Sequence, residues 1–211
     1  MPLQNRVTPD GRIIADAARG TMMGNRGVLH DEHKELGPAR WRHKNWVACR
    51  LEFNGRHRQV MTPRRYTELF FLDEAVAFAA GHRPCGECRR ADYLTFKKLW
   101  ERDVAGTAVS AKELDTWLHA ERAIPRQGRQ RYHAGELADL PSGAFVLLGG
   151  EGTQPFLVWQ DRLFPYLPAG YEAPMMRPLK GEVKVLTPPS TLKVFEAGLT
   201  PAVNLPAAYR A

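Results

Sequence analysis

The sequence lacks long hydrophobic segments. It contains no run of about eighteen apolar residues, the length that a membrane-spanning helix requires. The N-terminus also lacks the basic, then apolar, then small-residue order of a secretory signal peptide. We therefore expect a soluble protein located in the cytoplasm, with no membrane partner.

Cysteine is also scarce. The chain holds three cysteines, Cys49, Cys85 and Cys88, and an odd number fits poorly with a disulfide framework. With 211 residues, the chain can bury a hydrophobic core without covalent staples. Reduced thiols are therefore expected, and the pair Cys85 and Cys88 has the spacing of metal ligands.

Negative charge is in short supply in the first two-thirds of the chain. Residues 1–131 hold 24 Lys and Arg against 16 Asp and Glu, whereas residues 132–211 hold 6 against 7. Of the 30 cations, 22 are arginine, whose planar guanidinium group suits phosphate oxygens and base edges. This local excess favours a polyanionic partner, although arginine is also an ordinary solvated surface residue.

An Asn-Gly pair predicts a β-hairpin. Asn54-Gly55 separates the strand-like runs 46–53 and 56–61, and this pair is a strong signal for a two-residue turn. Counting outward from the turn pairs Cys49 with Val60. By contrast, residues 1–40 have several glycines and little apolar periodicity, so we predict an ordered but irregular segment there.

Helix signals surround the cysteine pair. Residues 72–80 read as a short helix with Asp73 as its N-cap and Gly81 just after its end. Aromatic side chains at helical spacing predict a second helix over 89–101. A capping box that starts at Ser110 opens a third helix, which ends before Pro125.

The composition becomes neutral and β-like after residue 133. We expect a last helix between Ser190 and Gly198, preceded by strands at 144–148, 156–160, 163–166 and 183–186. The prediction is an α+β fold in which a hairpin and helices surround the cysteine knuckle. It divides the chain into a basic region, 1–133, with a knuckle module at 46–101, and a small β-rich region, 134–211.

The knuckle itself is Arg83-Pro84-Cys85-Gly86-Glu87-Cys88-Arg89-Arg90. A Cys-x-x-Cys pair supplies half of a tetrahedral zinc site, and Cys49 is the one other thiol that could join it. A histidine would complete the site, but the spacing selects none of the candidates His30, His33, His43 and His82. The alternative for Cys49 is a small buried hydrophobic residue on the inner face of a strand.

Residues 49–89 resemble the zinc-binding N-terminal domain of the Ada DNA-repair proteins. The shared features are a cysteine-bearing hairpin, the aromatic pair Phe70-Phe71, a short helix ending in Ala80-Gly81, and Arg83-Pro84-Cys85-x-x-Cys88. The resemblance implies a zinc-organised module that contacts DNA in repair or modification, with Cys85 and Cys88 as ligands.

The resemblance also implies a role for Cys49, which stands at the place of a hairpin cysteine. In the Ada family, one hairpin cysteine both ligates zinc and accepts a methyl group from a methylated DNA phosphate. Here Phe53, four residues after Cys49, stands where the second hairpin cysteine would be. The resemblance therefore supports an Ada-like scaffold more strongly than it supports methyl transfer. We make no prediction that the chain is an enzyme.

A second interpretation is a zinc-dependent deaminase of nucleobases or nucleosides. Such enzymes combine His-x-Glu with a later Pro-Cys-x-x-Cys, and this chain contains His30-Asp31-Glu32 and Pro84-Cys85-Gly86-Glu87-Cys88. Glu32 would then move protons. However, His-x-Glu should open a helix, whereas Gly37-Pro38 follows closely here. A third interpretation is a non-catalytic interaction module whose zinc only holds the fold.

Arginines flank both the predicted hairpin and the knuckle, and more follow in a later basic loop. If the partner is nucleic acid, which the resemblance implies to be DNA, these side chains contact its phosphates. If not, they pair with nearby carboxylates on a solvated surface. The candidates are Arg64, Arg65, Arg83, Arg89, Arg90, Arg126, Arg129 and Arg131.

Overall fold

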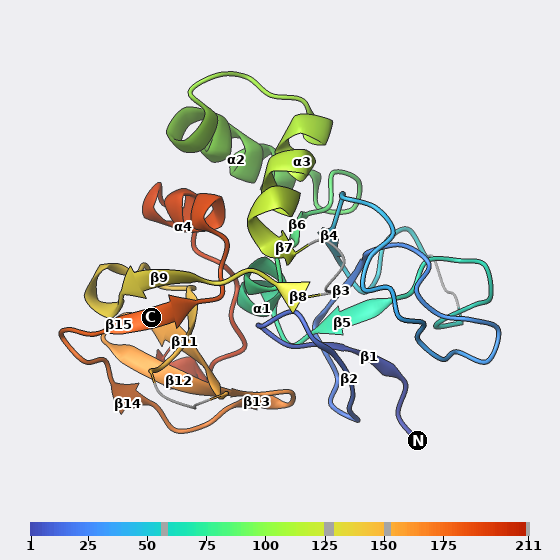
Figure 1. The fold of residues 1–211 in the computed structure, drawn as a ribbon, viewed down its shortest axis with the longest axis horizontal. Helices are drawn as coiled ribbons and strands as arrows, with labels where there is room; N and C mark the ends of the chain where they lie inside the picture. Colours follow the sequence, from blue (N-terminus) through green and yellow to red (C-terminus); the bar gives the residue numbers. More distant parts are fainter. Residues whose placement is uncertain (56–58, 125–128, 150–152, 210–211) are drawn as a thin grey trace.

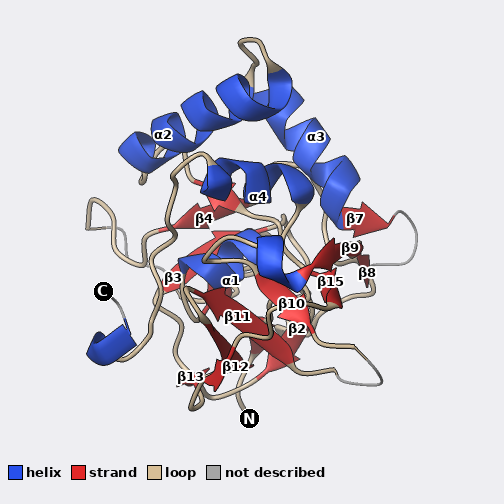
Figure 2. Cartoon of the chain, turned by 90° about the vertical axis from the view of Figure 1, so that its left-hand side faces the viewer, coloured by secondary structure: helices blue, strands red, loops and turns tan. Residues whose placement is uncertain are grey.

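The protein is described by a computed structural model that covers residues 1–55, 59–124, 129–149 and 153–209. Two multi-stranded β-sheets lie on either side of a short central helix, α1 (Glu74–Ala79), as Figure 1 shows. Three further helices gather over one end of the strands (Figure 2). This arrangement confirms the expected α+β class.

The first sheet contains strands from the segment that the sequence predicts to be irregular. Its strand order is β2-β1-β5-β3-β4-β6. The prediction of irregular structure over residues 1–40 is therefore wrong where β1, β2 and β3 form, because these segments join distant strands in one sheet, whereas the described residues 26–40 contain no helix or named strand. The strands are β1 (Gln4–Val7), β2 (Ile13–Ala15), β3 (Met22–Asn25), β4 (Val47–Cys49), β5 (Leu69–Phe71) and β6 (Arg83–Pro84).

The predicted hairpin does not form as a β-ladder among the described residues. Asn54 and Gly55 do make a turn, with φ of 52° and 63°, but β4 ends at Cys49. Cys49 pairs with Met23 of β3, and Val60 lies in a turn. Residues 56–58 lie outside the described residues. The Asn54-Gly55 signal specifies only the local turn, whereas the partner strand of β4 is determined by long-range packing.

The second sheet follows the prediction closely. Its order is β13-β12-β11-β10-β15-β9, with β14 paired to β12. Every strand predicted after residue 133 is present within one or two residues. The strands are β9 (His133–Glu136), β10 (Phe145–Leu147), β11 (Pro155–Trp159), β12 (Arg162–Leu167), β13 (Gly170–Tyr171), β14 (Met175–Met176) and β15 (Glu182–Val185), and a separate pair joins β7 (Ala123–Ile124) to β8 (Arg129–Gln130).

The helices begin where their caps predict. Asp73 accepts a hydrogen bond from the Val76 amide and opens α1, and Ser110 forms the predicted capping box of α3 (Ala111–Arg122). Helix α2 (Arg90–Trp100) continues into a π-helical turn at Glu101–Ala105. Helix α4 spans Pro189–Glu196, and short 3-10 turns lie at Leu137–Asp139 and Ala207–Tyr209. Among the described residues, no helix is long and apolar enough to cross a membrane.

Helix α1 joins the two halves of the core. All six of its residues are buried. Ala75 and Val76 pack in a cluster that includes Phe71 of the first sheet and Phe164 of the second. Phe78 belongs to another cluster, formed with α2, α3, α4 and the second sheet. Apolar contacts therefore cross the boundary at residues 133 and 134.

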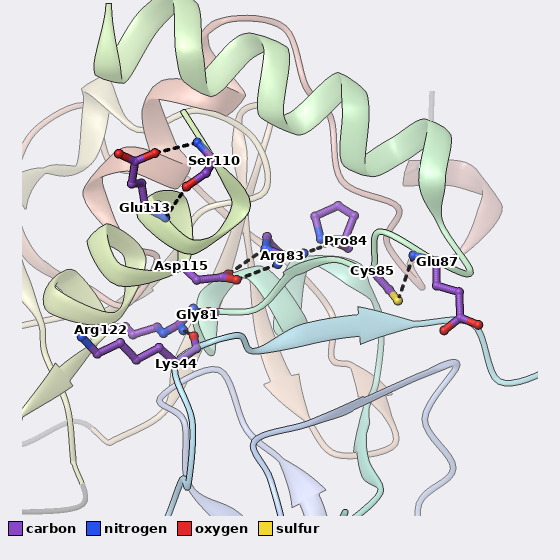
Figure 3. Close-up of polar contacts among 10 residues, drawn as sticks. All are labelled: Lys44, Gly81, Arg83, Pro84, Cys85, Glu87, Ser110, Glu113, Asp115 and Arg122. Atoms are coloured by element: carbon purple, nitrogen blue, oxygen red, sulfur yellow. Dashed lines mark hydrogen bonds and ion pairs between the residues drawn. The ribbon is translucent and has the colours of Figure 1, made fainter. Parts of the chain in front are cut away.

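Buried arginines tie α3 to the first sheet. Arg83 of β6 makes a two-pronged ion pair with Asp115 of α3, with both N–O distances 2.7 Å (Figure 3). Their side chains are 6% and 7% exposed. Arg122, also on α3, donates to the carbonyl oxygens of Gly81 and Lys44 (Figure 3). At Gly81, with a φ of 78°, a Cβ atom would overlap Arg122, so glycine is required there.

The Arg83–Asp115 pair gives a test of this packing. Asp115→Ala leaves a buried guanidinium group without its partner, so we expect the free energy of unfolding to fall by about 3–5 kcal/mol. Chemical denaturation monitored by circular dichroism measures it. The control is Asp103→Ala, which breaks an exposed pair with Arg102 and should change stability by less than about 1 kcal/mol. Equal losses in both variants would contradict the proposed importance of burial.

Candidate metal centre

Parallel pairing of β4 with β6 brings two distant cysteines together. Val47 lies opposite Arg83 and Ala48 opposite Pro84, so the next residues along the two strands are Cys49 and Cys85. The Cys85 amide donates to the Ala48 carbonyl oxygen at 3.0 Å, which continues this pairing by one step. Cys88 follows in the tight turn before α2.

The three thiols form a compact cluster. The sulfur atoms of Cys49, Cys85 and Cys88 all lie within 4.8 Å of one another. A tetrahedral zinc ion with Zn–S bonds of about 2.3 Å holds its sulfur atoms about 3.8 Å apart, which this cluster can accommodate. The Glu87 amide donates to the Cys85 sulfur at 3.4 Å (Figure 3). The donor set therefore fits a thiophilic metal ion, although its geometry does not identify the metal.

Hydrogen bonds within the cluster, together with burial, shift the pKa values of the three thiols in different directions. The contact with Cys85, together with burial, raises the pKa of Cys49. The same contact, together with the backbone amides of Cys88 and Glu87, lowers the pKa of Cys85 to about 5. Burial raises the pKa of Cys88. Cys85 is thus the most acidic of the three thiols, and a cation bound by all three sulfurs would displace the protons that they carry.

The cluster opens into a cavity of about 780 Å³. Its floor is one face of the first sheet, because residues paired across strands and two apart along a strand share a face. The opposite face, with Ala48, Leu69 and Phe71, belongs to the core. The floor carries Met23, Asn25, Val47, Cys49, Glu68 and Phe70, and the loop residues Arg50, Phe53 and Tyr66 contribute walls.

The candidate histidines do not join the cluster. Among the described residues, the group of possible metal ligands contains the three cysteines and no histidine or carboxylate. His30 instead contacts Thr67 and Thr62 through its two ring nitrogens. His43 contacts Asn25, and His82 is buried against Trp46 and Phe71.

Glu32, the candidate proton carrier of a deaminase, is placed on the surface. Its side chain is 80% exposed, as is most of neighbouring His33, with which it makes a loose ion pair at 3.9 Å. Residues 31–35 form a turn instead of the start of a helix. The structure therefore brings neither part of His30-Asp31-Glu32 into the cysteine cluster.

Two of the candidate nucleic-acid contacts lie in the interior. Arg83 is committed to Asp115, and Arg89 donates to Glu74 and Asp92. Both guanidinium groups bind carboxylates within the chain, so they are not available to a phosphate on the surface. Arg89 pairs with nearby carboxylates, as the alternative expects, but it does so in the interior and not on a solvated surface.

The remaining candidates have different positions. Arg64, Arg65, Arg90 and Arg131 are exposed, and Arg131 donates to the Ala123 carbonyl oxygen. Arg129 lies in β8, and Arg126 lies outside the described residues.

Sequence reasoning missed the cavity residues Arg50, Glu68 and Met23. Arg50 directly follows Cys49 in the sequence, and this position is the one sequence feature that could have indicated its place in the site. The other two reach the site only through the pairing of β3 with β4 and β5.

No protein-family model, curated protein or solved structure matches this chain. The functional interpretation therefore rests on the geometry of the cysteine cluster and its cavity. The resemblance to the Ada domain stays a prediction.

The cluster predicts a metal site that depends on a residue far from the knuckle in sequence. We expect purified protein to bind one zinc ion per chain, and Cys49→Ser to lose most of it because two thiols alone leave the site half open. Elemental analysis measures the zinc, and the absorption of the Co²⁺-substituted protein reports the number of thiolate ligands. His33→Gln, which changes an exposed potential ligand outside the cluster, is the control and should retain full occupancy. Retention of zinc by Cys49→Ser would contradict the three-thiolate site.

Proposed function

We propose that this protein is a zinc-dependent, DNA-interacting protein with an Ada-like scaffold, acting in DNA repair or modification. The observation that carries the proposal is the convergence of Cys49, Cys85 and Cys88 at the wall of an open cavity. A purely structural zinc site is normally closed by four protein ligands. A site with three thiolates and a cavity beside it leaves room for a group from a bound molecule.

The order of elements around the cluster supports the Ada-like part of the proposal. A cysteine ends β4, the aromatic pair Phe70-Phe71 lies in β5, α1 follows, and the chain turns at Gly81 into the knuckle. Phe53 occupies part of the cavity wall in place of a second cysteine. The proposal therefore does not include methyl transfer, and the role proposed for Cys49 is that of a metal ligand.

Exposed cations near the cluster support a polyanionic partner. Arg50 lines the cavity directly after Cys49, and Arg90 is exposed two residues after Cys88. Arg64 and Arg65 are exposed beside Tyr66, another cavity residue. Phosphate groups of DNA are the polyanion that the arginine-rich composition suits best.

Salt dependence tests the DNA interaction. We expect zinc-loaded protein to bind a short DNA with an affinity that falls steeply as salt rises, because each phosphate contact releases counterions. Replacing Arg50, Arg65 or Arg90 singly by alanine should weaken binding and lower the slope of log affinity against log salt by about one. Fluorescence anisotropy of labelled DNA across a salt series measures both quantities.

The control for this series is Arg102→Ala. Arg102 is exposed and paired with Asp103 in the π-helical turn after α2, so the 11-residue helix α2 separates it from the cysteine knuckle. Its replacement should leave affinity and slope unchanged. Binding that is insensitive to salt would overturn the proposal. A melting temperature that falls on chelation yet never responds to DNA would favour the non-catalytic module in its place.

A further inference from the structure

A buried glutamate stands on the cavity floor away from the cysteines. Glu68 is 4% exposed, and one carboxylate oxygen, Oε2, accepts a hydrogen bond from the Met61 amide at 2.7 Å. The other oxygen, Oε1, is buried and has no hydrogen-bond partner in the part of the chain that the structure describes. Buried polar atoms are nearly always paired with protein groups or ordered water, so this acceptor at the edge of a cavity is available to a donor that enters the cavity.

The backbone that holds Glu68 is itself unusual. Met61 is fully buried and has a φ of 54°, in the left-handed region that non-glycine residues seldom adopt. Residues held in such conformations cluster at ligand-binding and catalytic sites. Here the strained residue supplies the amide that fixes Oε2 and so orients the carboxylate.

Glu68 is too far from the cysteines to act on the metal directly. Met23 of β3 pairs with both Cys49 of β4 and Phe70 of β5, so Cys49 and Phe70 are two strand spacings apart, about 10 Å. Glu68 lies two residues before Phe70 on the same face, and it is not in the group of possible metal ligands. The floor between the two polar ends is formed by the apolar side chains of Met23 and Phe70.

We propose that this cavity binds one unstacked nucleotide of DNA and that Glu68 reads its base. The inference rests on the proposed function, since it names the part of the DNA that enters the site. The cavity volume of about 780 Å³ lies in the range of small-molecule sites. Phe70 contributes an aromatic ring to the cavity, and the Arg6 guanidinium carbon lies 4.9 Å from the centre of that ring, so a base would stack on the face away from Arg6. Proteins commonly read a base outside the helix by stacking and by hydrogen bonds to its Watson–Crick edge.

The chemistry of Glu68 selects the base. A carboxylate only accepts hydrogen bonds, so it favours a base edge that carries N–H groups. Guanine presents an imino N–H beside an amino group, which is the richest donor edge. Thymine presents one N–H between two carbonyl oxygens, and these oxygens would face the carboxylate. The cavity therefore prefers guanine and disfavours thymine, while the phosphate lies toward Arg50 and the cysteine cluster.

Binding of single-stranded oligomers to the zinc-loaded full chain tests the inference. One oligomer contains only thymidine, and the other carries a single central guanosine. We expect the guanosine to tighten binding about tenfold, the gain typical of a hydrogen bond to a charged group. Glu68→Gln should abolish this preference. The glutamine side chain would present its NH₂ donor to the base in place of Oε1, while its oxygen would still accept the hydrogen bond from the Met61 backbone amide.

Two controls complete the experiment. Glu52→Gln removes a negative charge from the exposed rim of the same cavity and should keep the guanosine preference. The Co²⁺ absorption of Glu68→Gln should match that of the unchanged protein, which shows that the metal site and fold are intact. If Glu68→Gln fails to fold, Phe70→Leu serves in its place, and loss of the aromatic face should weaken binding of the guanosine oligomer about tenfold.

The outcomes separate this inference from the proposed function. Binding of both oligomers with equal affinity, or a guanosine preference that survives Glu68→Gln, overturns the base-reading site while leaving DNA binding in place. Failure of the unchanged protein to bind either oligomer overturns the proposed function itself, and with it the inference.

Discussion

The parallel pairing of β4 with β6 is the constraint on which the candidate site depends. Parallel neighbours cannot be joined by a tight turn, so the chain must leave the sheet and return. After β4 the chain first adds β5 to the same sheet, then leaves the sheet through α1 and returns to it at Gly81. Arg83, the first residue of β6, is then fixed to α3 by its ion pair with Asp115. The cysteine cluster is therefore positioned by the same contacts that hold α3 against the sheet.

One sheet serves both the core and the cavity because its side chains alternate. Ala48, Leu69 and Phe71 face the core, whereas Met23 and Phe70 face the cavity. A slip of one residue in β3 or β5 would exchange these two sets, so the register that stabilises the core also determines the composition of the site. Core packing and the composition of the candidate site are therefore set by the same strand pairing.

The basic composition has two separate origins in the structure. Part of the excess is internal, since Arg26 and Arg122 lie on Trp46 with guanidinium carbons 4.2 and 4.1 Å from its ring centre. Burial lowers the pKa of Arg26 to about 9, and Arg83 is neutralised by Asp115. The rest is outside the core, and part of it, such as Arg50 and Arg90, lies near the knuckle. Only this second group can attract a polyanion, so the net charge of +7 overstates the surface available to one.

The sequence by itself determined the features that depend on neighbouring residues. The caps at Asp73 and Ser110, the turn at Asn54-Gly55, the strands after residue 133 and the metal-ligand spacing of the knuckle are all set within a few positions along the chain. The tertiary structure decided which strands pair. It formed three strands within residues 1–40, gave Cys49 the partner Met23 in place of Val60, and put Glu68 on the cavity floor. Strand pairing is satisfied by any segment that offers backbone hydrogen bonds and a matching apolar face, and local pattern does not specify which distant segment does so.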